Sequence, residues 1–143
     1  MNLYIVRHCQ TDINLEKRAQ GRKDKPLNEV GITQAIELRK KFEKEGLKFN
    51  DVYSSPQERA IQTAKIITSD GDVIIDKRLD VYNLDSADGM LMKDVKITGT
   101  VPDMSIYEGV ESLEEYKSRI YSNINNLAAL AFDIFRKRRK KSP

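Results

Sequence analysis

Two residue types that commonly act as nucleophiles stand side by side near the start of the chain. The stretch VRHCQTD, residues 6–12, holds the only histidine, His8, and the only cysteine, Cys9. A cysteine that attacks phosphate would be followed six residues later by an arginine that cups the anion, but that position is Leu15. The loop also lacks glycines that would turn consecutive N–H groups toward a phosphate. We therefore interpret Cys9 as a small packed residue and His8 as the candidate nucleophile.

The predicted surroundings of His8 favour an anionic ligand. An isolated histidine is more often a buried core residue, but His8 follows Arg7 at the C-terminal end of a predicted strand, Asn2–Val6. Arg59 begins the helix that follows a second predicted strand, so it lies at the same edge of a parallel sheet, where ligands bind in open α/β folds. Two guanidinium groups disfavour a cation and can each hold two oxygens of a phosphate dianion. The pattern predicts a phosphate site formed by Arg7, His8 and Arg59.

The elements that must position these residues alternate between strands and helices. Strands are predicted at Asn2–Val6, Asp51–Ser54 and Val73–Asp76, because these runs are short, apolar and bounded by polar turns. Helical spacing of apolar residues predicts one helix from Pro26 to a capping Gly46 and another over Gln57–Thr68. Strands that alternate with helices in this way indicate right-handed crossovers and a parallel sheet.

The second half of the chain has fewer regular signals. Arg78–Tyr107 is predicted to be mostly loop with a short helix near Met90, and Leu113–Arg138 has the apolar spacing of a long amphipathic helix. We expect one domain over residues 1–135 and a basic tail over residues 136–143. The net charge of +3 becomes −3 once the six basic residues at 136–141 are set aside, so the body shows no basic face and nucleic acid is not an expected partner.

Composition narrows the cellular setting and the chemistry. The 143 residues are 39% hydrophobic and 33% charged, as in an ordinary globular domain. A single cysteine cannot form an internal disulfide and no leader pattern is seen, so a cytoplasmic location is expected. No apolar run approaches the length of a membrane span. One histidine and one cysteine offer no zinc site, so neither a metal nor another cofactor is expected.

Five stretches, taken together and in order, resemble the histidine phosphatase superfamily, also called phosphoglycerate mutase-like. They cover roughly the first four-fifths of the chain with spacing similar to that of the family. The stretches are LYIVRHCQTDIN (3–14), RAQGRKDKPLNEVGITQA (18–35), VYSSPQERAIQTA (52–64), DKRL (76–79) and GVES (109–112).

The resemblance implies a three-layer α/β/α sandwich with a mainly parallel sheet. It also implies a two-step reaction in which neutral His8 attacks phosphorus, forms a phosphohistidine and passes the phosphoryl group to water or another hydroxyl. By position, Arg7 and Arg59 would be catalytic residues that hold the phosphate and stabilise its developing charge.

The same resemblance implies a set of substrate-binding residues. Thr11 and Asn14 match positions that line the phosphate pocket, while Gln20 and Gly21 match the loop that meets the rest of the substrate. Without the motif, Thr11 and Asn14 could equally be turn residues.

The chain departs from the family pattern at several positions. Cys9 replaces the glycine after Arg-His, and Val81 stands where the family has the glutamate that acts as general acid. Asp80 and Asp85 are the nearest carboxylates, and Asp80 is a possible acid only if the backbone is locally turned. After Ala131 the sequence lacks the strand and second histidine with which the family continues, so the fold is expected to be truncated at its C-terminal end.

These observations lead to one prediction of function and one rival. The first is phosphoryl transfer or hydrolysis of a small phosphorylated metabolite through phosphorylated His8, with weakened activity. The rival is an inactive relative that only binds anions, or a truncated product. The short C-terminus is either a truncation or a natural feature of a short relative. The expected loss of an internal strand would expose apolar surface and unpaired backbone groups, so a homodimer is expected.

Overall fold

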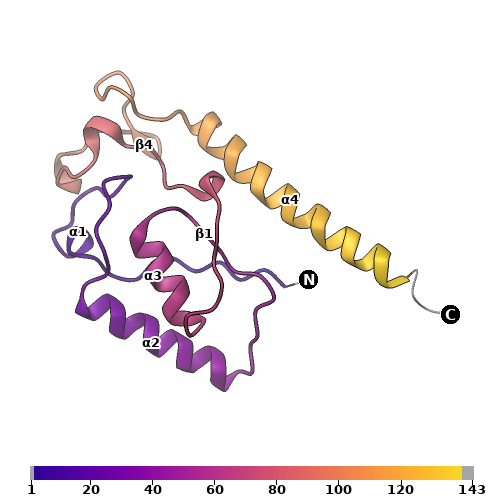
Figure 1. Ribbon diagram of the computed structural model, residues 1–143. Coiled ribbons are helices and arrows are strands. Elements are labelled where there is room, and N and C mark those ends of the chain that lie inside the picture. Colours follow the sequence, from indigo (N-terminus) through magenta and orange to yellow (C-terminus); the bar gives the residue numbers. More distant parts are fainter. Residues whose placement is uncertain (1, 140–143) are drawn as a thin grey trace.

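The computed structural model describes residues 2–139, and side chains up to residue 126. Its centre is a parallel strand pair, β1 (Tyr53–Ser54) and β2 (Ile74–Ile75), in the register Tyr53 to Ile74. Helix α3 (Glu58–Ile67) forms the crossover between them, and α2 (Glu29–Lys44) packs against α3. Figure 1 shows α4 (Leu113–Arg139) beyond the strand pair from α2 and α3. The predicted α/β arrangement with parallel pairing is confirmed.

Helix α2 begins at Glu29 rather than at the predicted Pro26, and it ends just before the predicted cap, Gly46. The side chain of Asn28 accepts the N–H of Gly31 at 2.9 Å and caps the helix, and Gly46 just past the end has a φ of +67°. Gly31 also allows close packing, because a Cβ at this position would lie 2.1 Å from the carbonyl oxygen of Gln10. The first turn of α2 therefore lies directly against the loop that carries His8.

The predicted strand Asn2–Val6 is wrong: within residues 2–139 this segment pairs with no other strand. Its side chains are exposed, with Ile5 at 86%. The ring of Tyr4 packs against that of Phe49, with 5.7 Å between the ring centroids. An apolar, β-branched run forms a strand only where a neighbouring backbone offers hydrogen bonds, and here none does.

The region predicted to be mostly loop contains the best-buried apolar cluster. Ala87 is fully buried and packs with Val95, Tyr107 and Val110. No α-helix forms near Met90, which is flanked by 3-10 turns instead. The short elements of this region are η1 (Lys77–Leu79), η2 (Asp85–Ala87), η3 (Met92–Asp94) and the antiparallel pair β3 (Ile97–Thr98) and β4 (Val101–Pro102).

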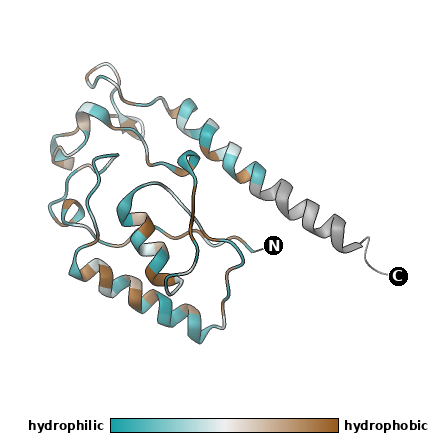
Figure 2. Cartoon of the chain, viewed as in Figure 1, coloured by the Kyte–Doolittle hydropathy of each residue, from teal (hydrophilic) through white to brown (hydrophobic). Residues whose placement is uncertain are grey.

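Helix α4 confirms the predicted long helix and is fastened to the centre by polar contacts. Asn123, only 1% exposed, donates to Asp76 at 2.8 Å. Arg119 forms a two-point ion pair with Glu111 and donates to backbone carbonyls that include that of Val81 at 2.9 Å. Figure 2 shows mostly hydrophilic colours on the described part of α4, in contrast to the apolar bands on α2 and α3.

Only the first four residues of the predicted basic tail, 136–139, lie within the described residues. Residues 136–139 continue α4, whereas residues 140–143 lie outside the described residues. None of the helices described over residues 2–139 combines the length and apolar character needed to cross a bilayer.

Candidate functional site

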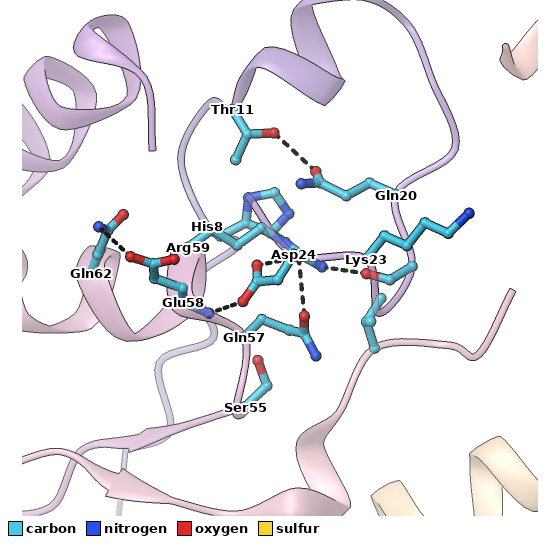
Figure 3. A network of polar contacts seen from close by, with 12 residues as sticks. His8, Thr11, Gln20, Lys23, Asp24, Ser55, Gln57, Glu58, Arg59 and Gln62 are labelled. Carbon is cyan, nitrogen blue, oxygen red and sulfur yellow. Dashed lines mark hydrogen bonds and ion pairs between the residues drawn. The ribbon is translucent and has the colours of Figure 1, made fainter. Parts of the chain in front are cut away.

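The site lies where the loop after residue 7 meets the beginning of α3, with the imidazole of His8 beside the guanidinium group of Arg59 (Figure 3). The His8 Nδ1 atom is 2.8 Å from the carbonyl oxygen of Cys9. Because a carbonyl only accepts, Nδ1 must carry the proton of the neutral ring, and the lone pair is on Nε2. The backbone thus selects the tautomer in which Nε2 can act as nucleophile.

The pKa of His8 also favours the neutral ring that a nucleophile needs. Burial lowers the pKa of His8 below its usual 6.5, and the positive charges of Arg59 and Arg7 lower it further, against the hydrogen bond to Cys9 and the charge of Asp24. The ring is therefore neutral at neutral pH, as a nucleophile requires.

Arg59 is held on three sides. Its side chain is 1% exposed; Nη1 donates to Asp24 Oδ1 at 2.8 Å and to Gln57 Oε1 at 3.2 Å, and Nη2 donates to the carbonyl of Gly21 at 3.0 Å. The remaining nitrogen, Nε, is buried and has no partner among the described residues. An unpaired buried donor on a fixed guanidinium group is costly.

Two residues join α3 to the loops around it. Asp24 accepts the backbone N–H of Glu58 at the first turn of α3, where negative charge is favoured. Thr63, one turn beyond Arg59, donates to the Arg59 carbonyl at 2.8 Å and accepts the backbone N–H of Cys9 at 3.1 Å. The loop that bears His8 is thereby fixed to the helix that bears Arg59.

Thr11 and Asn14, which were predicted to line the phosphate pocket, lie beside Gln20, which was predicted to belong to the loop that meets the rest of the substrate. Thr11 is fully buried and caps the short helix α1 (Asp12–Leu15) in a capping box with Asn14. Gln20 Oε1 accepts from Asn14 Nδ2 at 2.9 Å and from the Thr11 hydroxyl at 3.1 Å. This leaves Gln20 Nε2 buried and without a partner among the described residues. The site therefore has two unsatisfied donors, one from Gln20 and one from Arg59.

The loop around Gly21 is held by a residue that the sequence analysis missed. Asp88, 5% exposed, accepts the backbone N–H of Gly21 at 2.8 Å and of Lys23 at 2.7 Å. A Cβ on residue 21 would lie 2.9 Å from Asp88 Oδ2, so glycine permits this approach. No local pattern marks Asp88. Asp24 and Gln57 were also missed, although both lie inside the quoted motif stretches.

Asp80 was predicted as a possible acid only if the backbone is locally turned; its own φ of −56° and ψ of 147° are extended, so its role as an acid stays a prediction. Asp80 directly follows the 3-10 turn η1, and its carboxylate accepts from Gln57 Nε2 at 2.8 Å and lies 3.1 Å from Arg22 Nε. Two hydrogen bonds through Gln57 separate it from Arg59. Val81, the position of the family glutamate, brings no carboxylate.

Arg7 and Cys9 complete the set of predicted residues. Arg7 is exposed and makes no hydrogen bond or ion pair with another described residue, although its charge acts on His8. Burial raises the pKa of the Cys9 thiol, which keeps it protonated and unreactive at neutral pH. Across residues 2–126, acidic, histidine and cysteine side chains form no cluster of three that could hold a metal ion.

The chain is similar in sequence and in fold to known proteins of one superfamily. A family model described as the histidine phosphatase superfamily (branch 1) matches residues 3–132. A Proteus mirabilis protein named "Probable phosphoglycerate mutase GpmB" is 32% identical over 91% of this chain, and a Bacillus subtilis protein named "Uncharacterized phosphatase PhoE" is 34% identical over 84%. The alpha-ribazole phosphatase of Shigella flexneri superposes over 89% of this chain and 67% of its own with a TM-score of 0.75 at 22% identity, which shows a shared fold.

The chain is shorter than these relatives. It covers 64% of the length of the Proteus protein and 61% of the length of the Bacillus protein.

Proposed function

On the premise that this chain belongs to the histidine phosphatase superfamily, branch 1, we propose that it transfers phosphate from a small phosphorylated metabolite through a phosphohistidine at His8. The observation that carries the proposal is the arrangement around that residue. Its Nε2 bears the lone pair, and two buried donors, on Arg59 and Gln20, have no partner among the described residues and are of the kind that bind phosphate oxygens.

In the first step, the lone pair of His8 Nε2 forms a bond to phosphorus as the phosphorus–oxygen ester bond breaks. The Arg59 Nε–H and the charge of Arg7 stabilise the negative charge that spreads over the phosphoryl oxygens. The leaving oxygen takes a proton, for which Asp80 is the candidate donor in the place of the family glutamate. In the second step, water or another hydroxyl attacks phosphorus and the phosphorus–nitrogen bond breaks.

The substrate class rests on the relatives. Similar proteins are named as a phosphoglycerate mutase and as a phosphoserine phosphatase, and phosphoglycerate and phosphoserine are small molecules rather than proteins. The choice between hydrolysis and mutase chemistry depends on the acceptor in the second step, either water or a second hydroxyl.

We expect activity weaker than that of relatives with the full motif. Cys9 in place of glycine alters the loop of the nucleophile, and Val81 in place of glutamate removes the usual acid. General acid catalysis contributes about 10²–10⁴-fold, so an imperfect substitute slows alkyl phosphates more than aryl phosphates, whose leaving groups need little protonation.

The test uses the chain's single histidine. The native chain and His8→Ala are exposed to an aryl phosphate, and acid-labile, base-stable phosphate on the protein is measured. Label on the native chain alone supports the proposal, and Cys9→Ser should retain it. An unlabelled native chain that still binds inorganic phosphate would overturn the proposal in favour of the rival, an anion-binding protein without catalysis.

A further inference from the structure

A buried amide bridges the two charged groups that the proposed reaction needs. Gln57 is 7% exposed; its Oε1 accepts from Arg59 Nη1 at 3.2 Å and its Nε2 donates to Asp80 Oδ1 at 2.8 Å. A guanidinium group only donates and a carboxylate only accepts, so the amide can satisfy both partners in this orientation alone.

The location of Gln57 explains why its side chain is available for this bridge. Gln57 occupies the N-cap position of α3 but makes no capping hydrogen bond. The carboxylate of Asp24 takes over that role by accepting the N–H of Glu58. A short polar residue would be preferred at an N-cap, whereas the longer glutamine reaches past the helix end to Asp80.

Beyond Asp80 the connection reaches the protein surface. Arg22 Nε lies 3.1 Å from Asp80 Oδ2, and the Arg22 side chain is 45% exposed. Gln57 Nε2 and the backbone N–H of Val81 both donate to Asp80 Oδ1, at 2.8 Å and 2.9 Å, and Arg22 contacts Oδ2. Oδ1 is thus held by two donors, whereas Oδ2 contacts a partly exposed side chain.

We propose that Gln57 is a positioning residue that holds Asp80 at a fixed distance from the phosphate-binding Arg59, so that Asp80 Oδ2 delivers its proton to the leaving oxygen. This inference rests on the proposed function above. In the step, the Asp80 O–H bond breaks, the proton goes to the ester oxygen that departs from phosphorus, and Asp80 is left as a carboxylate. The water that attacks in the second step returns a proton to Asp80.

The bridge can be broken without removing the other contacts of Arg59. Asp24 and Gly21 hold the guanidinium group independently of Gln57. Gln57→Glu keeps an acceptor for Arg59 but places a carboxylate against Asp80, which it can no longer hold. Gln57→Leu removes both hydrogen bonds and adds no charge. Gln34→Glu on α2 is a matched control, since its partner is the backbone N–H of Gln10 and a carboxylate can still accept it.

The experiment measures kcat and KM of the 143-residue chain with p-nitrophenyl phosphate and with glycerol 2-phosphate. For Gln57→Glu and Gln57→Leu we expect kcat to fall about 10–100-fold on the alkyl ester and less than about threefold on the aryl ester, with KM nearly unchanged. Gln34→Glu should match the native chain. Circular dichroism and thermal unfolding confirm that each variant is folded, and either variant alone suffices for the comparison.

Other outcomes distinguish a failure of the proposed role of Gln57 from a failure of the proposed phosphoryl transfer through His8. Equal losses on both esters, a change in KM alone or no change at all would show that Gln57 does not act through Asp80, while labelled His8 would keep the proposed function intact. A native chain that neither turns over either ester nor acquires phosphate on His8 would overturn both.

Discussion

The two halves of the candidate site are held in different ways. The α3 half, consisting of Asp24, Gln57 and Arg59, is joined by hydrogen bonds, with Arg59 at 1% exposure. The N-terminal half, residues 2–8, is an exposed segment without strand pairing up to Arg7, and only His8 at its end is partly buried. The tightly held half carries Arg59, which is expected to bind phosphate, whereas the exposed half carries Arg7 and His8, the residue expected to attack phosphorus.

The contrast indicates that the position of Arg59, expected to bind phosphate, and the position of His8, expected to attack phosphorus, depend on different parts of the fold. The guanidinium group of Arg59 is prepared before any ligand arrives, because its partners are already in place. The imidazole of His8 depends on the loop that follows it, and on the single hydrogen bond between Cys9 N–H and Thr63 that fixes the loop to α3. Substitutions on either side of this boundary should therefore have different consequences for stability and for catalysis.

The largest expected effect comes from removing the buried guanidinium group. Arg59→Met should lower kcat/KM for an aryl phosphate about 10²–10³-fold. It should also lower the free energy of unfolding by about 2–4 kcal/mol, because Asp24, Gln57 and Gly21 lose their donor. Urea unfolding and steady-state kinetics measure the two effects.

The same substitution at the exposed arginine sharpens the comparison. Arg7→Met should also reduce kcat/KM, since it removes a positive charge near His8, but should change the free energy of unfolding by less than about 0.5 kcal/mol. Equal destabilisation by Arg7→Met and Arg59→Met would contradict the distinction between an exposed half and a buried one.

A smaller effect is expected at the contact that joins the halves. Thr63→Val keeps the shape of the side chain but removes the acceptor for Cys9 N–H, so we expect a loss of about 1–3 kcal/mol in unfolding free energy and about a tenfold fall in kcat. Thr68→Val is the matched control, because that hydroxyl bonds only within its own helix region. A kcat equal to that of the control would mean that the loop is positioned without Thr63.

The pH dependence of stability tests the burial of His8. Burial, then the charges of Arg59 and Arg7, lower its pKa below the 6.5 of the unfolded chain, so the unfolded chain takes up the proton first as pH falls. The stabilisation from neutral His8 is complete above about pH 6.5 and is lost as pH falls through the lower, folded-state pKa. Unfolding free energies between about pH 8 and pH 5 should therefore fall more for the native chain than for His8→Gln. Parallel profiles would show that His8 is not buried as described.

The smallest effect on the folded chain is expected at the exposed segment. Ile5 is 86% exposed, and we expect segments of this kind from two copies to associate into a homodimer. Light scattering should show that Ile5→Lys weakens association, while Ile106→Lys, a similar change at a distant exposed residue, does not. A native chain that stays monomeric over a wide concentration range would refute the dimer.

Local sequence patterns predicted the three long helices because their signals are self-contained, whereas the short helix α1 was not predicted. Gly46 marks the end of α2 and the apolar spacing after residue 113 marks α4, so hydrogen bonds within each helix follow from nearby residues. The strand Asn2–Val6 failed because its hydrogen bonds depend on a partner that a local pattern cannot supply. The apolar cluster around Ala87 was missed for a related reason: its members are scattered from Ala19 to Val110 without a period.

The sequence by itself determined which groups could do chemistry: the single His8, its neighbour Arg7, the second arginine Arg59, and the family to which their motifs point. Only the tertiary structure decided the tautomer of His8, the burial of Arg59 among Asp24, Gly21 and Gln57, and the bridge from Gln57 to Asp80. The contacts of Gln57 with Asp80 and of Arg59 with Gly21 join residues that are 23 and 38 positions apart, whereas the His8 tautomer depends on the backbone conformation that brings Nδ1 to the carbonyl of the next residue. Residue type sets what a side chain can donate, accept or attack, but its charge state and partners depend on solvent exclusion and contacts that exist only once the chain has folded.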